Sequence, residues 1–346
     1  MPISTINTNS IADDAVTVPK VTDQVLTHRN RIINGAMVID QRNSGTSITI
    51  TNTSSYTYTV DRWAAYTYPT GSKFSVQQNA GSVTPPVGFT NYLGATSLSA
   101  HSIGSTDIHV FRHAIEGFNI ADLGWGSANA KSVTLSFWVR SSLTGTFGGS
   151  LTNGLFNRSY PFSCTISVAN TWEQKKITIN GDTSGTWATD NTAGININFG
   201  LGVGSSYSGT AGSWASGDYR SSTGATSVVG TNGATFYVTG LQLEVGDTDT
   251  PFEHRSYGDE LARCQRYYVN SISTSFYNQS VSAHILRVAL PVEMRANPTV
   301  TRTGSFWSGS ENAPDIYPQY GNKKAFLISG GTSTFLGGSF LSDAEL

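Results

Sequence analysis

The chain has 346 residues and a formal net charge of −2, and only 13% of its residues are Asp, Glu, Lys or Arg. Charged residues make up about 25% of an average soluble domain, so this chain is unusually poor in charge. It has no cluster of Lys and Arg that could follow a phosphate backbone, and no apolar run long enough to span a bilayer. We therefore expect neither a nucleic-acid partner nor insertion into a membrane.

The first 30 residues differ from the rest of the chain. They carry isolated apolar side chains among Asn, Thr and Asp, and such a segment buries too little apolar surface to offset its conformational entropy. It also lacks a basic stretch followed by an apolar core, so we expect release by cell lysis rather than secretion. We expect residues 1–30 to attach to another protein through Ile3, Ile6, Ile11, Val16 and Val18.

Residues 31–255 show the alternation of apolar and polar positions that is typical of half-buried strands. The alternation is clearest in 133–139 and in 195–203, and it changes phase at Gly240, where we expect a β-bulge. Strand-and-turn spacing of this kind predicts an all-β fold with a jelly-roll β-sandwich as its main domain. Further strands are expected around 56–66, 72–79, 106–116, 160–168 and 172–180.

Residues 256–346 begin with the one helix that the sequence predicts. Ser256 and Asp259 form a capping box, and a short helical run follows them. The remainder returns to a strand pattern, which makes a small C-terminal β module. A module of this size without a disulfide is marginal by itself, so we expect it to pack against a sister subunit.

Several motifs occur in a fixed order between residues 30 and 268. They are RIINGAMVIDQRN at 31–43, YTVDRW at 58–63, KSVTLSFWVR at 131–140, NTWE at 170–173, FYVTGLQLEVG at 236–246, and the stretch from TPFE at 250–253 to CQRYY at 264–268. Together they resemble a family of tail-fibre and minor structural proteins of bacteriophages, including phages of cyanobacteria. The strand order also resembles the jelly-roll carbohydrate-binding modules of secreted glycosidases.

Two shorter segments extend this resemblance. NSIADDAVT at 9–17 is similar to a short repeat of trimeric phage fibre shafts, and MRANPT at 294–299 is similar to the C-terminal modules of such fibres. The resemblance implies an N-terminal virion-attachment segment, a threefold assembly and a distal β-sandwich.

Two hydroxyl-rich loops carry the candidate glycan-binding residues. Sugars present apolar C–H faces ringed by hydroxyl groups, so their sites pair flat aromatic rings with short polar side chains, and loops on a rigid sandwich commonly carry binding sites. We select Trp187, Asp190 and Asn191 from the first loop, and Trp214 and Tyr219 from the second, which also holds Tyr207, Asp218 and Arg220. Packing over a sheet edge or at a subunit contact explains the two tryptophans equally well.

Three carboxylates that follow the last long strand are candidate calcium ligands. Carbohydrate-binding jelly rolls often hold a structural calcium through carboxylates and backbone carbonyls. Glu244, Asp247 and Asp249 supply such groups here, with Asp61 as a fourth. A solvated acidic turn is the simpler interpretation, and we predict no other cofactor.

His109 and His113 share one face of a predicted strand with Asp107. Two imidazoles and a carboxylate suit zinc or nickel, although histidines in such a strand are more often ordinary surface or interface residues.

The sequence carries no signature of catalysis. Glycan-cleaving enzymes need paired carboxylates, and none of the acidic residues lies in a distinctive motif. The Gly-x-Ser-x-Gly elbow, the P-loop and the His-Glu-x-x-His motif are absent as well. We therefore predict that the protein is not an enzyme.

These observations predict a homotrimeric bacteriophage tail-fibre protein, located in the virion, with three parts. Residues 1–30 attach to a tail or baseplate protein, 31–255 form the jelly-roll sandwich, and 256–346 form the helix and the C-terminal module. The expected partner on the cell is a host-surface polysaccharide or lipopolysaccharide. The alternative is a purely structural virion protein, such as a capsid decoration protein or baseplate component, that does not bind glycans.

Overall fold

The computed structural model describes residues 28–277, 284–303, 315–330 and 335–346. The five predicted attachment residues, Ile3, Ile6, Ile11, Val16 and Val18, lie outside the described residues. Strands dominate the described part, which has one α-helix, α1 (Tyr257–Gln265), and four short 3-10 helices. The all-β fold class is therefore confirmed. In this part of the chain, no helix is long and apolar enough to cross a membrane.

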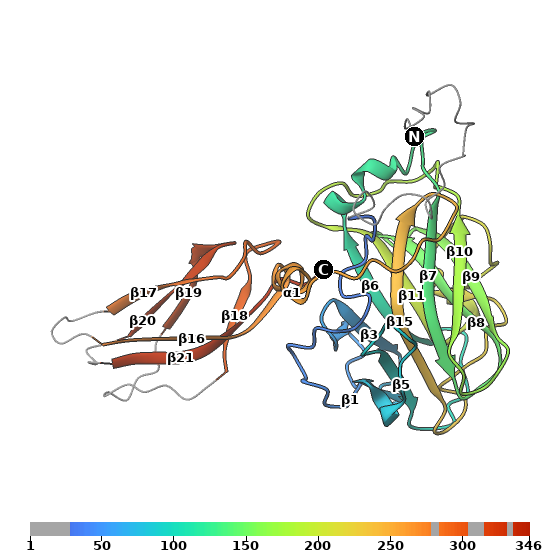
Figure 1. Cartoon of the computed structure of the whole chain (residues 1–346), viewed down its shortest axis with the longest axis horizontal. Helices are drawn as coiled ribbons and strands as arrows, with labels where there is room; N and C mark the ends of the chain where they lie inside the picture. Colours follow the sequence, from blue (N-terminus) through green and yellow to red (C-terminus); the bar gives the residue numbers. More distant parts are fainter. Residues whose placement is uncertain (1–27, 278–283, 304–314, 331–334) are drawn as a thin grey trace, which may run out of the picture.

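Two antiparallel sheets form a β-sandwich, seen on the right of Figure 1. The six-stranded sheet has the order β1 (Ile48–Thr49), β4 (Phe74–Gln78), β5 (Leu93–Ser97), β15 (Thr235–Val245), β7 (Val133–Ser141) and β10 (Glu173–Ile179). The seven-stranded sheet has the order β13 (Ala215–Ser216), β9 (Arg158–Ile166), β8 (Gly145–Asn153), β11 (Ala193–Val203), β6 (Ile108–Glu116), β3 (Trp63–Tyr68) and β2 (Thr57–Tyr58). The chain crosses repeatedly from one sheet to the other, which is the predicted jelly-roll topology.

The inward faces of the two sheets form one continuous apolar core. Every second residue of β7 from Val133 to Val139 is fully buried, as the sequence alternation predicts, but the intervening Thr134 and Ser136 are buried as well, so the first half of the strand is covered on both faces. The β-bulge expected at Gly240 is also confirmed, because the register of β15 against β7 shifts between Thr239 and Gln242. Gly240 itself has φ = 62°, a conformation that glycine adopts without steric cost.

Short elements fill the connections of the sandwich. They are the 3-10 helices η4 (Ala80–Ser82), η5 (Gly117–Asn119), η6 (Ala121–Leu123) and η7 (Ser205–Tyr207), and the parallel pair β12 (Ser208–Gly209) and β14 (Ser221–Ser222). β14 contacts β8, β9 and β11, so the long connection between β11 and β15 folds back over the seven-stranded sheet.

Helix α1 leads into a smaller β module, seen on the left of Figure 1. The Ser256 side chain accepts a hydrogen bond from the Asp259 N–H, which confirms the predicted cap. One three-stranded sheet has the order β16 (Tyr268–Tyr277), β21 (Phe335–Asp343) and β18 (Thr299–Arg302). The other has the order β17 (His284–Ala289), β20 (Ala325–Gly330) and β19 (Asp315–Asn322).

The last residues of the chain return from this module to the sandwich. Figure 1 shows the chain end beside α1, and the Glu345 carboxylate there forms ion pairs with Arg42 and Arg62 of the sandwich. The main-chain oxygen of Leu346 accepts hydrogen bonds from Tyr58 and Arg112. The small module is thus fastened to the sandwich of its own chain through buried charged contacts.

Candidate functional site

A groove of about 270 Å³ lies on the outward face of the seven-stranded sheet. Ala65 of β3 and Phe111 of β6 belong to the core, so the neighbouring Tyr66 and Arg112 point to the opposite face. The groove is lined by aromatic and hydroxyl-bearing residues together with one aliphatic residue, one acid and one base: Ser54, Ser55, Tyr56, Tyr66, Tyr68, Ile108, Phe156, Tyr207, Asp218 and Arg220.

Tyrosine rings form one wall of the groove. The rings of Tyr56 and Tyr66 lie 5.1 Å apart between centroids, and the Arg112 guanidinium lies 4.2 Å from the centre of the Tyr56 ring. Arg112 is held by Asn196, whose side-chain oxygen accepts hydrogen bonds from its Nε and Nη2 atoms. Tyr68 completes the wall and is 41% exposed. These contacts hold the tilted Tyr56 and Tyr66 rings in position before any ligand arrives.

Arg220 connects this wall to the rest of the groove. Its guanidinium pairs with Asp218, donates a 2.7 Å hydrogen bond to the Tyr56 hydroxyl and lies 3.8 Å from the centre of the Phe156 ring. Burial would lower the pKa of Arg220, but Tyr56 and Asp218 outweigh that effect and raise it. The Asp218 carboxylate remains half-exposed and can accept further hydrogen bonds. The groove thus presents flat apolar rings beside charged and hydroxyl groups.

The sequence-predicted tryptophans lie elsewhere, in an aromatic cluster with Trp125. The Trp187 ring is 4.7 Å from the Trp125 ring and 5.4 Å from the Trp214 ring, with steep interplanar angles. Trp187 is only 7% exposed, and its indole N–H donates to the Ser184 carbonyl. The prediction that Trp187 offers an open ring face to a sugar is therefore wrong, because the ring is a core residue. Trp214 is half-buried against Tyr160 in the same cluster, and its indole N–H donates to the Asn180 carbonyl.

We expect the substitution Trp187→Phe to reduce the free energy of unfolding by about 1–2 kcal/mol, the usual range for a core change that removes packing and one hydrogen bond. Urea denaturation of the full chain measures this difference. Ligand binding by the folded variant should stay unchanged, because Trp187 does not line the groove. A variant as stable as the native chain, with impaired ligand binding, would instead restore Trp187 as a site residue.

The three polar residues predicted for glycan binding have separate environments. The exposed Asp190 accepts hydrogen bonds from the Thr192 N–H and hydroxyl, at 2.9 Å and 2.6 Å. Asn191 contacts the C-terminal module, since its side-chain amide donates to the Arg295 carbonyl. Tyr219 is half-buried between the two groove residues Asp218 and Arg220. The second predicted loop therefore reaches the groove, whereas Asp190 and Asn191 do not line it.

The structure does not bring the candidate calcium ligands together as a set of three. The buried Glu244 carboxylate accepts hydrogen bonds from Gln242 and from both the N–H and hydroxyl of Thr250. Asp249 pairs with Lys176 at 3.0 Å, and Asp247 accepts from the Thr248 hydroxyl. Each carboxylate thus has its own protein partner, and calcium binding here stays a prediction.

Asp61, the fourth candidate, is buried near the docked chain end. It accepts hydrogen bonds from the backbone and side chain of Gln41. Burial outweighs these bonds and raises its pKa to about 7. Asp61 is therefore part of the interior rather than of an exposed acidic turn.

The predicted histidine pair is separated. His113 is buried beside Trp63, and its Nε2 atom lies 3.0 Å from the Ile33 carbonyl oxygen. His109 lies instead near Asp107 and near His101, which was not among the predicted ligands.

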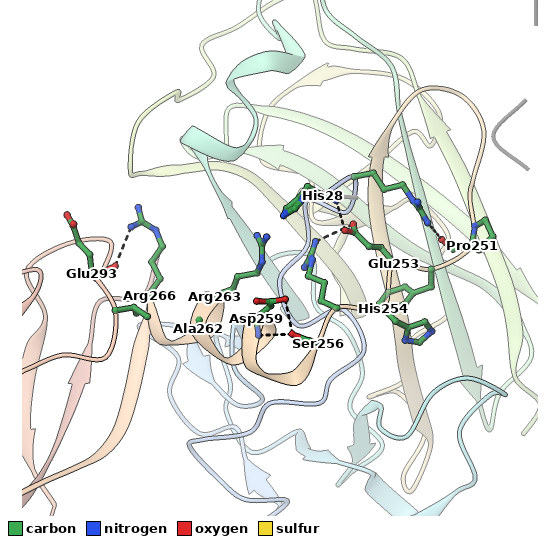
Figure 2. A pocket seen from close by; sticks show the side chains of 14 residues that line it. His28, Pro251, Glu253, His254, Ser256, Asp259, Ala262, Arg263, Arg266 and Glu293 are labelled. Atoms are coloured by element: carbon green, nitrogen blue, oxygen red, sulfur yellow. Dashed lines mark hydrogen bonds and ion pairs between the residues drawn. The ribbon is translucent and has the colours of Figure 1, made fainter. Parts of the chain in front are cut away.

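A larger cleft of about 900 Å³ lies where α1 meets the sandwich (Figure 2). Its charged groups are largely satisfied within the chain. The Glu253 carboxylate accepts hydrogen bonds from the backbone N–H groups of His28 and Asn30, and Arg266 pairs with the buried Glu116. These contacts hold the start of the described chain, the end of the sandwich and the helix together, so we assign this cleft a structural role.

Comparison with known proteins finds no matching family model and no matching curated protein. Among solved structures, the enzymatically active domain of tailspike protein 4 from bacteriophage CBA120 is similar, with 11% identity and a TM-score of 0.32. That match covers 61% of this chain but only 22% of the tailspike chain.

Two further structures are similar over most of their own length. One is a putative sugar binding protein from Bacteroides thetaiotaomicron, with 11% identity and a TM-score of 0.37 over 63% of this chain and 100% of that chain. The other is a family 11 carbohydrate-binding module from Clostridium thermocellum, solved with a mixed-linked tetrasaccharide, with 13% identity and a TM-score of 0.28 over 60% of this chain and 97% of that chain.

Proposed function

We propose that this chain is a non-enzymatic glycan-binding protein and that the groove on the seven-stranded sheet is its binding site. The observation that carries the proposal is the combination of the Tyr56 and Tyr66 rings with the Arg220–Asp218 pair in one groove. Aromatic faces cover the apolar C–H surface of a sugar, while charged groups exchange hydrogen bonds with its hydroxyl groups. A volume of about 270 Å³ suits the end of a glycan rather than a long stretch of it.

The composition of the groove supports binding without cleavage. Glycoside hydrolysis uses two carboxyl groups, one as acid and one as base or nucleophile. Asp218 is the only carboxylate among the residues that line this groove, and it is committed to Arg220. A ligand bound there meets one carboxylate and no second acid.

We further propose that the protein acts in a bacteriophage tail fibre, as a homotrimer that binds a host-surface polysaccharide or lipopolysaccharide. The support is the ordered set of sequence motifs between residues 30 and 268 and the trimeric-shaft-like segment at 9–17. In this proposal, residues 1–30 bind a tail or baseplate protein. Three copies of a small groove in one fibre would raise the avidity for a repetitive cell surface far above the affinity of a single site.

The test is a binding screen of the purified full-length chain against a glycan array and against extracted host lipopolysaccharide, with its mass in solution measured alongside. We expect a trimer that binds one glycan class without releasing reducing ends. A chain that ignores all glycans and cells but attaches to fibre-less virions would contradict the proposal and favour the purely structural alternative.

A further inference from the structure

His101, Asp107 and His109 form a cluster beside β6, next to the groove residue Ile108 in the chain. One ligand atom from each residue lies within 4.8 Å of the others, and no other group of three His, Cys, Asp or Glu residues is arranged in this way within the described ranges. His101 lies in the connection between β5 and β6, Asp107 directly precedes β6, and His109 lies within β6. The cluster therefore joins a connection between the two sheets to a strand of the seven-stranded sheet.

The hydrogen bonds of His109 fix the position of its ring proton. Nδ1 of His109 lies 2.8 Å from the Thr67 hydroxyl oxygen, and that hydroxyl donates its one proton to the Thr70 carbonyl at 2.7 Å. The hydroxyl must therefore accept a hydrogen bond from Nδ1–H of His109. The neutral ring consequently carries its lone pair on Nε2.

That Nε2 atom has no hydrogen-bond partner among the described residues, and it cannot bond to bulk water because His109 is 0% exposed. Buried polar atoms in proteins are nearly always satisfied, so an orphaned acceptor requires an explanation. Burial and the neighbouring His101 lower the pKa of His109 to about 4.

The other two members of the cluster supply a charge and a movable ligand. The Asp107 carboxylate accepts a hydrogen bond from the Gly104 N–H at 2.9 Å, and one of its oxygens lies 2.7 Å from His101 Nε2. Metal binding through Nε2 requires the His101 proton to lie on Nδ1 or to be released. Burial would raise the pKa of Asp107, but the contacts with Gly104 and His101 outweigh it and lower the pKa. The His101 side chain is 18% exposed, so it gives the cluster access to solvent.

We propose that this cluster is a binding site for a divalent first-row transition metal, of which zinc fits best, with His101 Nε2, the Asp107 carboxylate and His109 Nε2 as protein ligands. Two imidazoles and one carboxylate are a donor set that zinc takes in proteins. The Thr67 hydroxyl orients His109 in the way that outer partners orient metal-ligating histidines. Ligands of tetrahedral zinc lie about 3.3 Å apart, so the partly exposed His101 side chain has to shift for all three atoms to bind one ion. The bound metal fastens the connection before β6 to β3 and β6.

The experiment uses the untagged full-length chain, freed of metal with a chelator and titrated with Zn²⁺ by calorimetry. Absorption of Co²⁺ in the same site reports the coordination geometry. We expect one equivalent of either metal to bind, with a tetrahedral Co²⁺ spectrum. His101→Ala should weaken binding by at least about 100-fold, and Thr67→Val by about 10- to 100-fold, because it removes the partner that orients His109.

Two comparisons keep this test decisive. His28→Ala removes an exposed histidine outside the cluster and should leave the affinity for Zn²⁺ unchanged. His101 is partly exposed in a connecting segment, so its variant should fold, which circular dichroism verifies. A native chain that binds no Zn²⁺, or a folded His101→Ala variant that binds it as tightly as the native chain, would overturn the proposal.

Discussion

Replacing Tyr66 with Ala is expected to weaken glycan binding by at least about 30-fold, equivalent to about 2 kcal/mol. Tyr66 is central to the groove, because its ring packs against Tyr56 and projects from the rigid strand β3. Truncation removes the apolar face that a sugar ring would cover and leaves Tyr56 without its neighbour. Calorimetric titration with the glycan identified in the binding screen measures the loss.

The substitution Tyr66→Phe separates the ring from its hydroxyl group. That hydroxyl donates only a long hydrogen bond of 3.3 Å to the Thr53 carbonyl, so the ring should keep its position in the Phe variant. We expect the Phe variant to bind within about threefold of the native affinity. Tyr257→Ala is the matched control, since Tyr257 is 64% exposed on α1 and does not line the groove.

Other combinations of results would relocate the site. If Tyr66→Ala binds the glycan like the native chain, the groove is not the binding site. If Trp214→Ala then abolishes binding, the aromatic cluster at the sandwich end has that role, as the sequence predicted for this residue.

Local sequence patterns were sufficient to predict most of the long strands, the helix cap and the β-bulge. Each of these features depends on residues that are close together in the sequence. They are the alternation in β7, the hydrogen bond from the Asp259 N–H to the Ser256 side chain, and the change of phase at Gly240. The sequence also indicated the loop that contains Asp218 and Arg220. The strands β5 and β8 were missed, because small residues such as glycine obscure their alternation.

The groove as a whole could not be predicted, because several segments that are distant in the sequence build it. Tyr56 and Tyr66 come from the first part of the sandwich, Phe156 from the turn between β8 and β9, and Arg220 from the connection before β15. Nothing in the local sequence places these segments together, since only the sheet order does so. The interpretation of Trp187 as a site residue also failed because of a contact between distant segments. Trp187 lies in a polar connection, yet it folds inward and meets Trp125 from another connection.

The second large effect is expected at the end of the chain, where Glu345→Gln should reduce the free energy of unfolding by about 3–5 kcal/mol. The Glu345 side chain is 4% exposed and pairs with Arg62, which is fully buried. Burial would lower the pKa of Arg62, but Glu345 outweighs that effect and raises it. Arg62 also lies 3.5 Å from the centre of the Tyr267 ring. A neutral glutamine would leave the Arg62 charge buried without its counter-charge.

Guanidinium denaturation of the full chain measures this loss, with Glu293→Gln as the matched control. Glu293 pairs with Lys324 at 3.2 Å, but both side chains are about half exposed or more, at 49% and 65%. Exposed pairs contribute little, so the control should lose less than about 1 kcal/mol. Equal stability of the two variants would mean that the buried pair does not anchor the chain end.

The double substitution Arg62→Met with Glu345→Leu tests the physical reason. If the cost of Glu345→Gln comes from an unpaired buried charge, removing both charges should recover most of the lost stability. The double variant also loses the Arg62 hydrogen bond to the Ala114 carbonyl and the Arg62 contact with the Tyr267 ring. If stability is not recovered, these contacts rather than the ion pair secure the chain end. In either case, the double variant distinguishes the contribution of the Arg62–Glu345 charges from that of the other contacts at the chain end. It thereby tests whether the small module depends on the sandwich of its own chain for the buried surface that it lacks by itself.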